Sequence, residues 1–110
     1  MILGILPDAA HTEILLDNLS EADFDLSDVS VILQDEEVRN SLASDPGPLG
    51  SVEPDQVSAA LVHLGVSKEN ADTCQRAVNE GKVLVTMNVD EKYRAAAEEM
   101  FKDHSAQLIK

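Results

Sequence analysis

The chain has 110 residues, with 8 Lys and Arg against 21 Asp and Glu, which gives a formal net charge of −13. This length is typical of one domain, residues 1–110, and is enough to bury a core without disulfides or a structural metal. Hydrophobic residues make up 44% of the chain, which excludes intrinsic disorder, whereas aromatic residues make up 3% and Trp is absent. The composition therefore predicts an aliphatic core, and it argues against the aromatic platforms that bind single-stranded nucleic acid.

The acidic residues gather in the first half of the chain. Residues 1–55 hold thirteen Asp and Glu against a single basic residue, Arg39, while residues 56–110 are nearly balanced. Because such a surface repels phosphate, we expect no binding to nucleic acid or to an anionic membrane. No apolar run approaches the ~20 residues that span a bilayer, and residues 1–6 lack the basic start of a signal peptide. The lone Cys74 cannot form an intramolecular disulfide, so we expect a cytoplasmic protein.

The first third of the chain predicts a strand, a helix and a second strand. The apolar run 2–6 is typical of a strand buried on both faces, and Pro7 ends it. Asp8 can cap the helix that follows, and a second strand with one strongly apolar face is expected from Val29 to Gln34. The apolar positions of the helix recur at helical spacing: Ala10, Ile14, Leu15 and Leu19.

The middle of the chain is the least regular part. Residues 35–44 allow a short acidic helix, and residues 44–50 hold two prolines and two glycines, which is the composition of a turn. A domain linker is an alternative, but neither side is long enough for an ordinary independent core. We therefore interpret this region as an insertion loop.

The second half predicts two helices, a strand, a third helix and a last short strand. The first helix begins at Pro54 and ends at Gly65, and the second begins after Ser67 and ends at Gly81. Residues 83–89 alternate as a strand, Asp90 caps the next helix, and residues 106–109 are expected to form a final strand. The inner faces of the three helices are expected to hold Val57, Leu61 and Leu64; Ala71, Cys74 and Val78; and Tyr93, Ala97, Met100, Phe101 and His104.

This order predicts an α+β fold of the ferredoxin-like class. Two β-α-β halves, separated by an insertion over about 35–81, form an antiparallel sheet with helices on one face. The first and third strands should be central, which agrees with their strongly apolar character. The main alternative is a small flavodoxin-like parallel sheet, but that fold needs helices on both faces and more strands than the sequence supplies.

One part of the sequence resembles a known family. The run Leu61-x-x-Leu64-Gly65-Val66-Ser67, followed by Ala71, Val78 and Gly81-Lys82-Val83-Leu84-Val85, is similar to the second half of the bacterial heat-induced general stress protein family. The likeness is good over residues 57–89 and loose over most of the chain. It departs where many relatives carry a long segment rich in glycine and alanine, whose place the 46–50 loop takes here. The resemblance implies the fold and a stress-associated role, and it supplies no catalytic residues.

Three acidic residues raise the question of a metal site. Asp23, Asp25 and Asp28 stand close together, as calcium ligands do. An EF-hand loop starting at Asp23 needs Gly where Asp28 stands and Glu where Gln34 stands. We therefore expect solvated turn residues and no metal. Phosphate-binding glycine motifs are absent from the sequence, so no nucleotide or other cofactor is expected.

The remaining candidates for chemistry are the histidines and the cysteine. Asp8 and His11 are three residues apart at a helix start, where they could form an acid–base pair and, weakly, a ligand site. A capping aspartate beside a surface histidine is the simpler interpretation. His63 and His104 are expected near helix ends in structural roles, and Cys74 as a small buried hydrophobic residue.

Three functional hypotheses follow, in order of preference. The first is a non-enzymatic module that forms a homodimer or binds another protein, with an open sheet face that carries Leu84 and Ile32 as the pairing surface. The second is a small-ligand-binding regulatory domain with a site near Pro7, Asp8 and His11. The third is an enzyme that uses Asp8 and His11 or Cys74, although the sequence implies no reaction.

Overall fold

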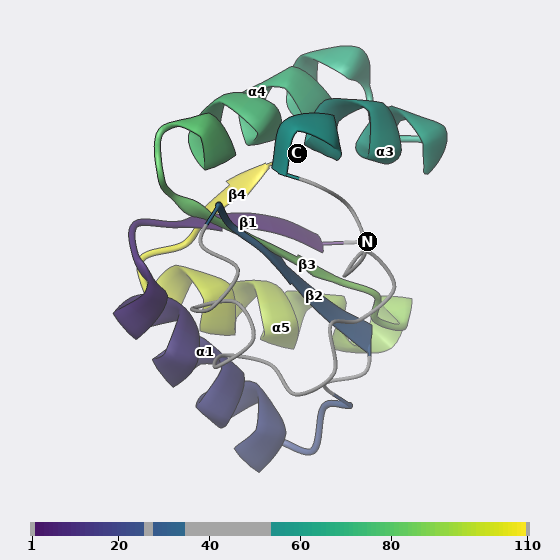
Figure 1. The fold of residues 1–110 in the computed structure, drawn as a ribbon. Helices are drawn as coiled ribbons and strands as arrows, with labels where there is room; N and C mark the ends of the chain where they lie inside the picture. Colours follow the sequence, from purple (N-terminus) through teal and green to yellow (C-terminus); the bar gives the residue numbers. More distant parts are fainter. Residues whose placement is uncertain (1, 26–27, 35–53, 110) are drawn as a thin grey trace.

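The computed structural model describes residues 2–25, 28–34 and 54–109 (Figure 1). Within these ranges the strands are β1 (Ile2–Leu6), β2 (Val29–Ile32), β3 (Val83–Met87) and β4 (Gln107–Ile109). The helices are α1 (Ala9–Glu21), the short 3-10 helix η2 (Pro54–Gln56), α3 (Val57–His63), α4 (Lys68–Asn79) and α5 (Glu91–Asp103). The acidic helix and the loop expected within residues 35–50 lie outside the described residues.

The four strands form one antiparallel sheet in the order β2-β3-β1-β4. The prediction that the first and third strands are central is confirmed, and every residue of both strands is buried. Their register pairs Ile2 with Met87 and Leu6 with Val83, so the apolar runs face each other along their whole length. The expected last strand is also present, as an edge strand beside β1.

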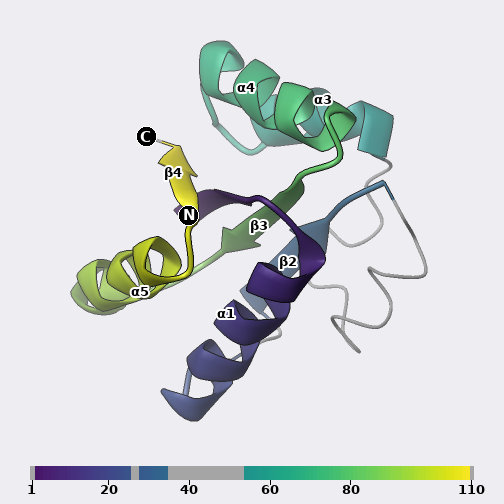
Figure 2. The same cartoon turned by 90° about the vertical axis from the view of Figure 1, so that its left-hand side faces the viewer.

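Helices cover both faces of this sheet (Figures 1 and 2). Because strand side chains alternate between the faces, Ile2 and Leu6 of β1 pack in the same core as α1 and α5. Leu3 and Ile5 point the other way and pack with α3 and α4. The molecule thus has a sheet between two helical layers, with an apolar core on each side.

The second helical layer corrects the expectation of an open sheet face. Leu84 is fully buried, with 0% exposure, and Ile32 is buried beside it beneath α3 and α4. The helix pair covers this face because both helices carry an apolar stripe, which the sheet face buries. The surface expected to pair two copies is therefore already occupied within one chain.

Hydrogen bonds hold α3 and α4 together as a unit. The Ser58 hydroxyl donates to Asp72 Oδ1 at 2.8 Å, and the Ser58 backbone N–H donates to Gln75 Oε1 at 3.0 Å. Gln75 in turn donates to Asn79 one turn further along α4. The bond to Gln75 satisfies the Ser58 N–H, which lies at the start of α3 and has no partner within its own helix.

The four α-helices in the described part of the chain end with the same backbone motif. In each, a residue with positive φ follows the helix, and two backbone N–H groups donate back to the last turn. Two of these residues are the predicted Gly65 and Gly81, whereas Asp23 and Ser105 adopt the same left-handed conformation at φ 67° without being glycine. At the other helix ends, Asp8 of α1 and Ser67 of α4 cap with their side chains as predicted. Asp90 stands at the expected cap position of α5 but makes no capping hydrogen bond with its side chain.

Four apolar side chains expected on inner helix faces are instead exposed, the last three of them by about half: Ala10, Ile14, Leu64 and Tyr93. In α1 the buried stripe passes through Leu15, Leu16 and Leu19, which leaves Ile14 one position off it. Leu64 lies beyond the last residue of α3, and Tyr93 lies in the first turn of α5. The expected strand 83–89 also stops earlier, at Met87. None of the described helices is long and apolar enough to span a bilayer.

Candidate functional site

A hollow of about 570 Å³ opens at one end of the sheet. Three segments meet there: the turn after α1, the start of β2 and the stretch from the end of β3 into α5. Antiparallel pairing of β2 with β3 brings them together, since Val29 faces Met87 and the Asn88 N–H donates to the Asp28 carbonyl at 3.1 Å. Residues more than 60 positions apart therefore share one surface.

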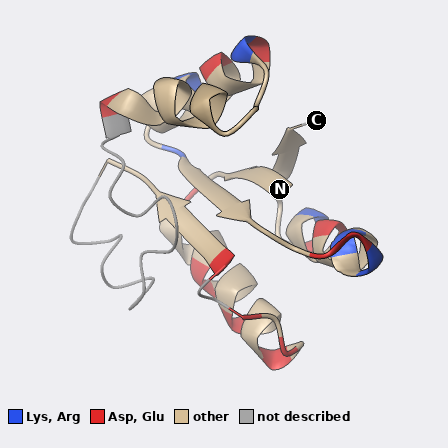
Figure 3. Ribbon diagram, turned by 90° about the vertical axis from the view of Figure 1, so that its right-hand side faces the viewer, with Lys and Arg blue, Asp and Glu red and all other residues tan. Residues whose placement is uncertain are grey.

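Acidic side chains dominate the polar part of this hollow, which we call the acidic hollow. It is lined by Asp23, Asp25, Asp28 and Asp90. Within the described residues, no Lys, Arg or His lies at ion-pair distance from Asp23, Asp28 or Asp90. Figure 3 shows that acidic residues also follow α1 toward this end of the molecule. A cation entering the hollow would therefore meet three carboxylates, those of Asp23, Asp28 and Asp90, that form no ion pair within the described residues.

Apolar and aromatic side chains supply the rest of the lining. Phe24, Met87, Val89 and Tyr93 contribute to it, so the hollow combines charge with apolar surface. The rings of Phe24 and Tyr93 meet edge to face, with centroids 6.4 Å apart and an interplanar angle of 89°. Such a contact between rings adds stability beyond the burial of their area. It fixes the turn after α1 against the start of α5.

The turn after α1 owes its shape to the end of that helix. Asp23 adopts the left-handed conformation, and the Phe24 N–H donates to the Leu19 carbonyl at 3.0 Å. This bond directs the chain back across the helix end, so that Phe24 packs partly against the core of the sheet. The same geometry sets Asp23 on the rim of the hollow.

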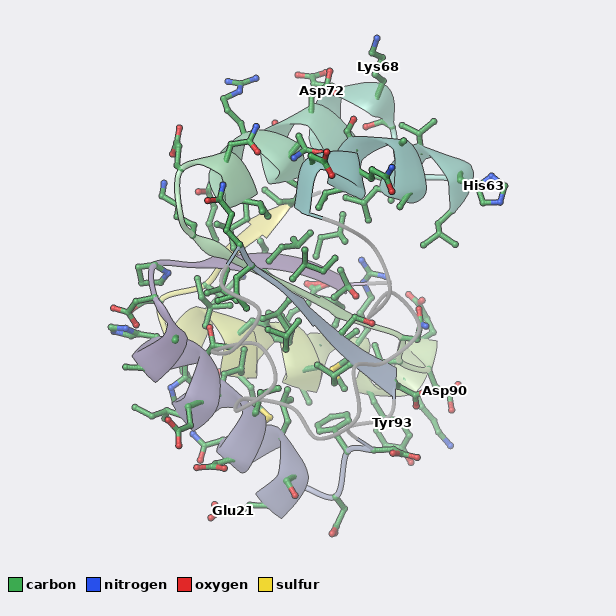
Figure 4. The ribbon with its side chains drawn as sticks, viewed as in Figure 1. Glu21, His63, Lys68, Asp72, Asp90 and Tyr93 are labelled. Carbon is green, nitrogen blue, oxygen red and sulfur yellow. The ribbon has the colours of Figure 1, made fainter. Side chains whose placement is uncertain are left out.

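Sequence reasoning found part of this site and missed the rest. It singled out Asp23, Asp25 and Asp28 as a group, but it placed Asp90 and Tyr93 only in helix roles. The pairing of β2 with β3 brings these two residues close to the three aspartates. That pairing cannot be predicted from the sequence of either strand alone. Figure 4 shows Asp90 and Tyr93 on the same side of the molecule. Among the described residues, no three acidic, His or Cys side chains are arranged to hold a metal ion.

Asp8 and His11 do meet, at the start of α1. Asp8 Oδ1 accepts from the His11 backbone N–H at 2.9 Å and lies 2.7 Å from the His11 ring atom Nδ1. These hydrogen bonds, the backbone bond first, hold the pKa of the Asp8 carboxyl below its ordinary value. Both side chains are about half exposed, and neither lines the acidic hollow.

The other candidates lie apart from the hollow. Cys74 is fully buried among the α3 and α4 residues, and burial raises the pKa of its thiol to about 11. At neutral pH this thiol is protonated, and a protonated thiol is a poor nucleophile. His63 points away from the body of the molecule at the end of α3 (Figure 4). His104 ends α5 and hydrogen-bonds through Nε2 with the Asn18 side chain, which connects α5 to α1.

A second, smaller hollow of about 170 Å³ lies at the opposite end of β3. Arg76, Lys82 and Glu80 contribute to its lining, and Lys82 pairs with Glu80 at 3.4 Å. Because this ion pair is exposed, it contributes little to stability. The two ends of β3 therefore differ in charge, with the acidic hollow at one and a mixed, partly basic surface at the other.

The fold and this geometry define the chain as a small α+β protein with a charged hollow at the end of its sheet. Comparisons with models of protein families, with curated protein sequences and with solved structures find no match.

Proposed function

We propose that this chain is a non-enzymatic cytoplasmic binding module that docks a basic segment of another protein. The observation that carries the proposal is the acidic hollow, where Asp23, Asp28 and Asp90 lie beside apolar side chains and form no ion pair with any described residue. A Lys or Arg side chain fits this lining, because its charged end meets the carboxylates while its methylene stem packs on apolar surface. A net charge of −13 also speeds the approach of basic partners.

The proposal extends to the fold class and to the biological setting. We assign the sheet with α1 and α5 to the ferredoxin-like class, with α3 and α4 as an insertion between β2 and β3. The antiparallel strand order β2-β3-β1-β4 supports this assignment. The association with a bacterial stress response rests on the sequence resemblance over residues 57–89 alone.

The binding test uses a nine-residue peptide of alternating Lys and Gly, labelled with fluorescein and followed by fluorescence anisotropy. The triple variant Asp23→Asn, Asp28→Asn, Asp90→Asn removes the charge of the hollow with little change in side-chain volume. Since exposed charge pairs contribute about 0.2–1 kcal/mol each, we expect the peptide affinity to fall about tenfold. Binding should also weaken as salt is added, because salt screens exposed charges.

A matched control separates the hollow from the general negative charge. Glu13→Gln, Asp17→Asn and Glu99→Gln remove the same three charges from exposed positions on α1 and α5. This variant should bind the peptide nearly as well as the unchanged protein. Equal losses in the two variants, or no binding by the unchanged protein, would contradict the proposal.

A small-ligand-binding regulatory role is the second candidate function. Its support is the size of the acidic hollow, about 570 Å³, which lies within the range typical of small-molecule sites. Thermal-shift measurements with free lysine, arginine and spermidine test it, because a ligand that binds the folded state raises Tm. A rise in Tm that the Asp90→Asn variant loses would favour this function, and unchanged Tm values would count against it.

The proposed homodimer needs a surface other than the sheet face. Val62 and Leu64 at the end of α3 are 45% and 50% exposed, and they are the apolar residues we assign to a contact between copies. Light scattering at micromolar concentration should give twice the chain mass of 11.9 kDa, and Leu64→Lys should lower it. A mass of one chain for the unchanged protein would refute the dimer.

A further inference from the structure

One basic side chain contacts a residue that lines the acidic hollow. Lys92 Nζ is 5.0 Å from the centre of the Tyr93 ring, a distance at which an ammonium group is attracted to an aromatic face. Tyr93 belongs to the lining of the hollow, and 49% of its surface is exposed. The ring therefore offers a cation-binding surface, and in the free protein the chain's own lysine uses it.

The start of α5 is an unfavourable place for a lysine. Lys92 lies in the first turn of α5, where the helix dipole disfavours a positive charge. Side chains at consecutive positions of a helix do not face each other, so Lys92 must bend to reach the ring of its neighbour. Within the described residues Lys92 forms no ion pair, and its ammonium group lies over the ring of Tyr93.

We propose that Tyr93 and the neighbouring Asp90 form the subsite for a Lys or Arg side chain of the protein partner, and that Lys92 occupies the Tyr93 ring face of this subsite until the partner displaces it. This inference rests on the proposed binding function and adds a named contact and an internal competitor to it. The partner's cation gains the ring face together with the carboxylates of the hollow. Removal of Lys92 should therefore strengthen binding, because it frees the ring and removes a repelling charge.

The test compares two variants that change the net charge equally. Lys92→Met removes the competitor, and Lys102→Met removes a second exposed lysine from the last turn of the same helix, away from the ring. With the labelled Lys–Gly peptide, we expect Lys92→Met to bind about two- to fivefold more tightly than Lys102→Met. Tyr93→Leu alone should weaken peptide binding. When Tyr93→Leu is combined with Lys92→Met or with Lys102→Met, the two double variants should bind the peptide equally well.

The composition of the chain supplies a direct spectroscopic readout. Tyr93 is the single tyrosine and there is no Trp, so the intrinsic fluorescence of the protein reports on this ring. Lys92→Met should change the emission of the free protein, and Lys102→Met should leave it unchanged. Unlabelled Lys–Gly peptide has no aromatic residue, so the intensity of the Tyr93 emission should change as the peptide is added and level off when binding is saturated.

The outcomes separate this inference from the proposed function. No peptide binding by the unchanged protein or by any variant would overturn both. Binding that is equal in Lys92→Met and Lys102→Met, or unchanged in Tyr93→Leu, would overturn the inference and leave the binding function standing. Spermidine that binds as tightly as the peptide would overturn the assignment of the subsite to a protein partner.

Discussion

Replacement of Gly4 by alanine should destabilise the protein through one identifiable contact. Gly4 lies in the middle of β1, paired with Val85 on one side and Leu108 on the other. A Cβ atom at this position would lie 2.4 Å from Cδ2 and 2.8 Å from Cε2 of Phe101. Carbon atoms in contact are normally about 3.5–4.0 Å apart, so the ring would have to move by about 1 Å. Phe101 is fully buried, and close-packed surroundings oppose such a movement.

The expected magnitude is the difference between two opposing effects. Extra volume in a packed core typically costs about 1–3 kcal/mol. Replacing glycine by alanine also restricts the unfolded chain, which stabilises the folded state by about 0.4–1 kcal/mol. We expect a net loss of about 1–2 kcal/mol in the free energy of unfolding for Gly4→Ala. For a chain of this length, that corresponds to a fall in Tm of about 4–9 °C.

Urea unfolding of a double-mutant cycle isolates the contact. Gly4→Ala is measured in the unchanged protein and in a Phe101→Val background, at one protein concentration throughout. Valine ends at its γ carbons and therefore lacks both ring atoms that the new Cβ would meet. The loss caused by Gly4→Ala should shrink or disappear in that background, a coupling of about 1–2 kcal/mol.

Gly81→Ala serves as the control for this cycle. Its φ is 88° and a Cβ there meets no atom within 4 Å, so backbone strain alone should destabilise this variant. Its loss should therefore be the same in both Phe101 backgrounds. An equal loss for Gly4→Ala in the two backgrounds would refute the steric explanation.

Three further predictions concern a helix end, the buried thiol and the start of α1. Ser105→Gly should stabilise the protein by about 0.5–1 kcal/mol in urea unfolding, because Ser105 has a φ of 67°; an unchanged midpoint would contradict this. Burial raises the pKa of Cys74 to about 11, so this thiol is protonated at pH 8. A thiol reagent should therefore modify Cys74 at a rate no greater than the unfolding rate of the protein. The same shift means that stability falls as the pH rises from about 9 toward 11, and Cys74→Ala should lack this fall. Hydrogen bonds from His11 lower the pKa of Asp8, so its contribution to stability is present above about pH 4 and is lost as the pH falls further. Asp8→Asn should therefore flatten the acid side of the stability curve, and an unchanged curve would count against the contact.

Local features of the sequence determined most of the secondary structure. The apolar runs of β1 and β3 identified the central strands, because a strand buried on both faces needs apolar residues at every position. Asp8 and Ser67 identified helix starts, and Gly81 a helix end, because these residue types satisfy backbone groups within one turn. Each of these signals lies within a few residues of the structure that it specifies.

The tertiary structure alone decided which surfaces meet. A periodic pattern shows that a helix has an apolar face, but it does not say what that face covers, so the packing of α3 and α4 over Leu84 could not be derived from it. The left-handed Asp23 and Ser105 also escaped sequence reasoning, since non-glycine residues rarely take this conformation without support from surrounding contacts. The acidic hollow depends on strand register, which brings Asp90 and Tyr93 to Asp23 from the other half of the chain. Register is a property of paired strands, and neither strand contains it alone.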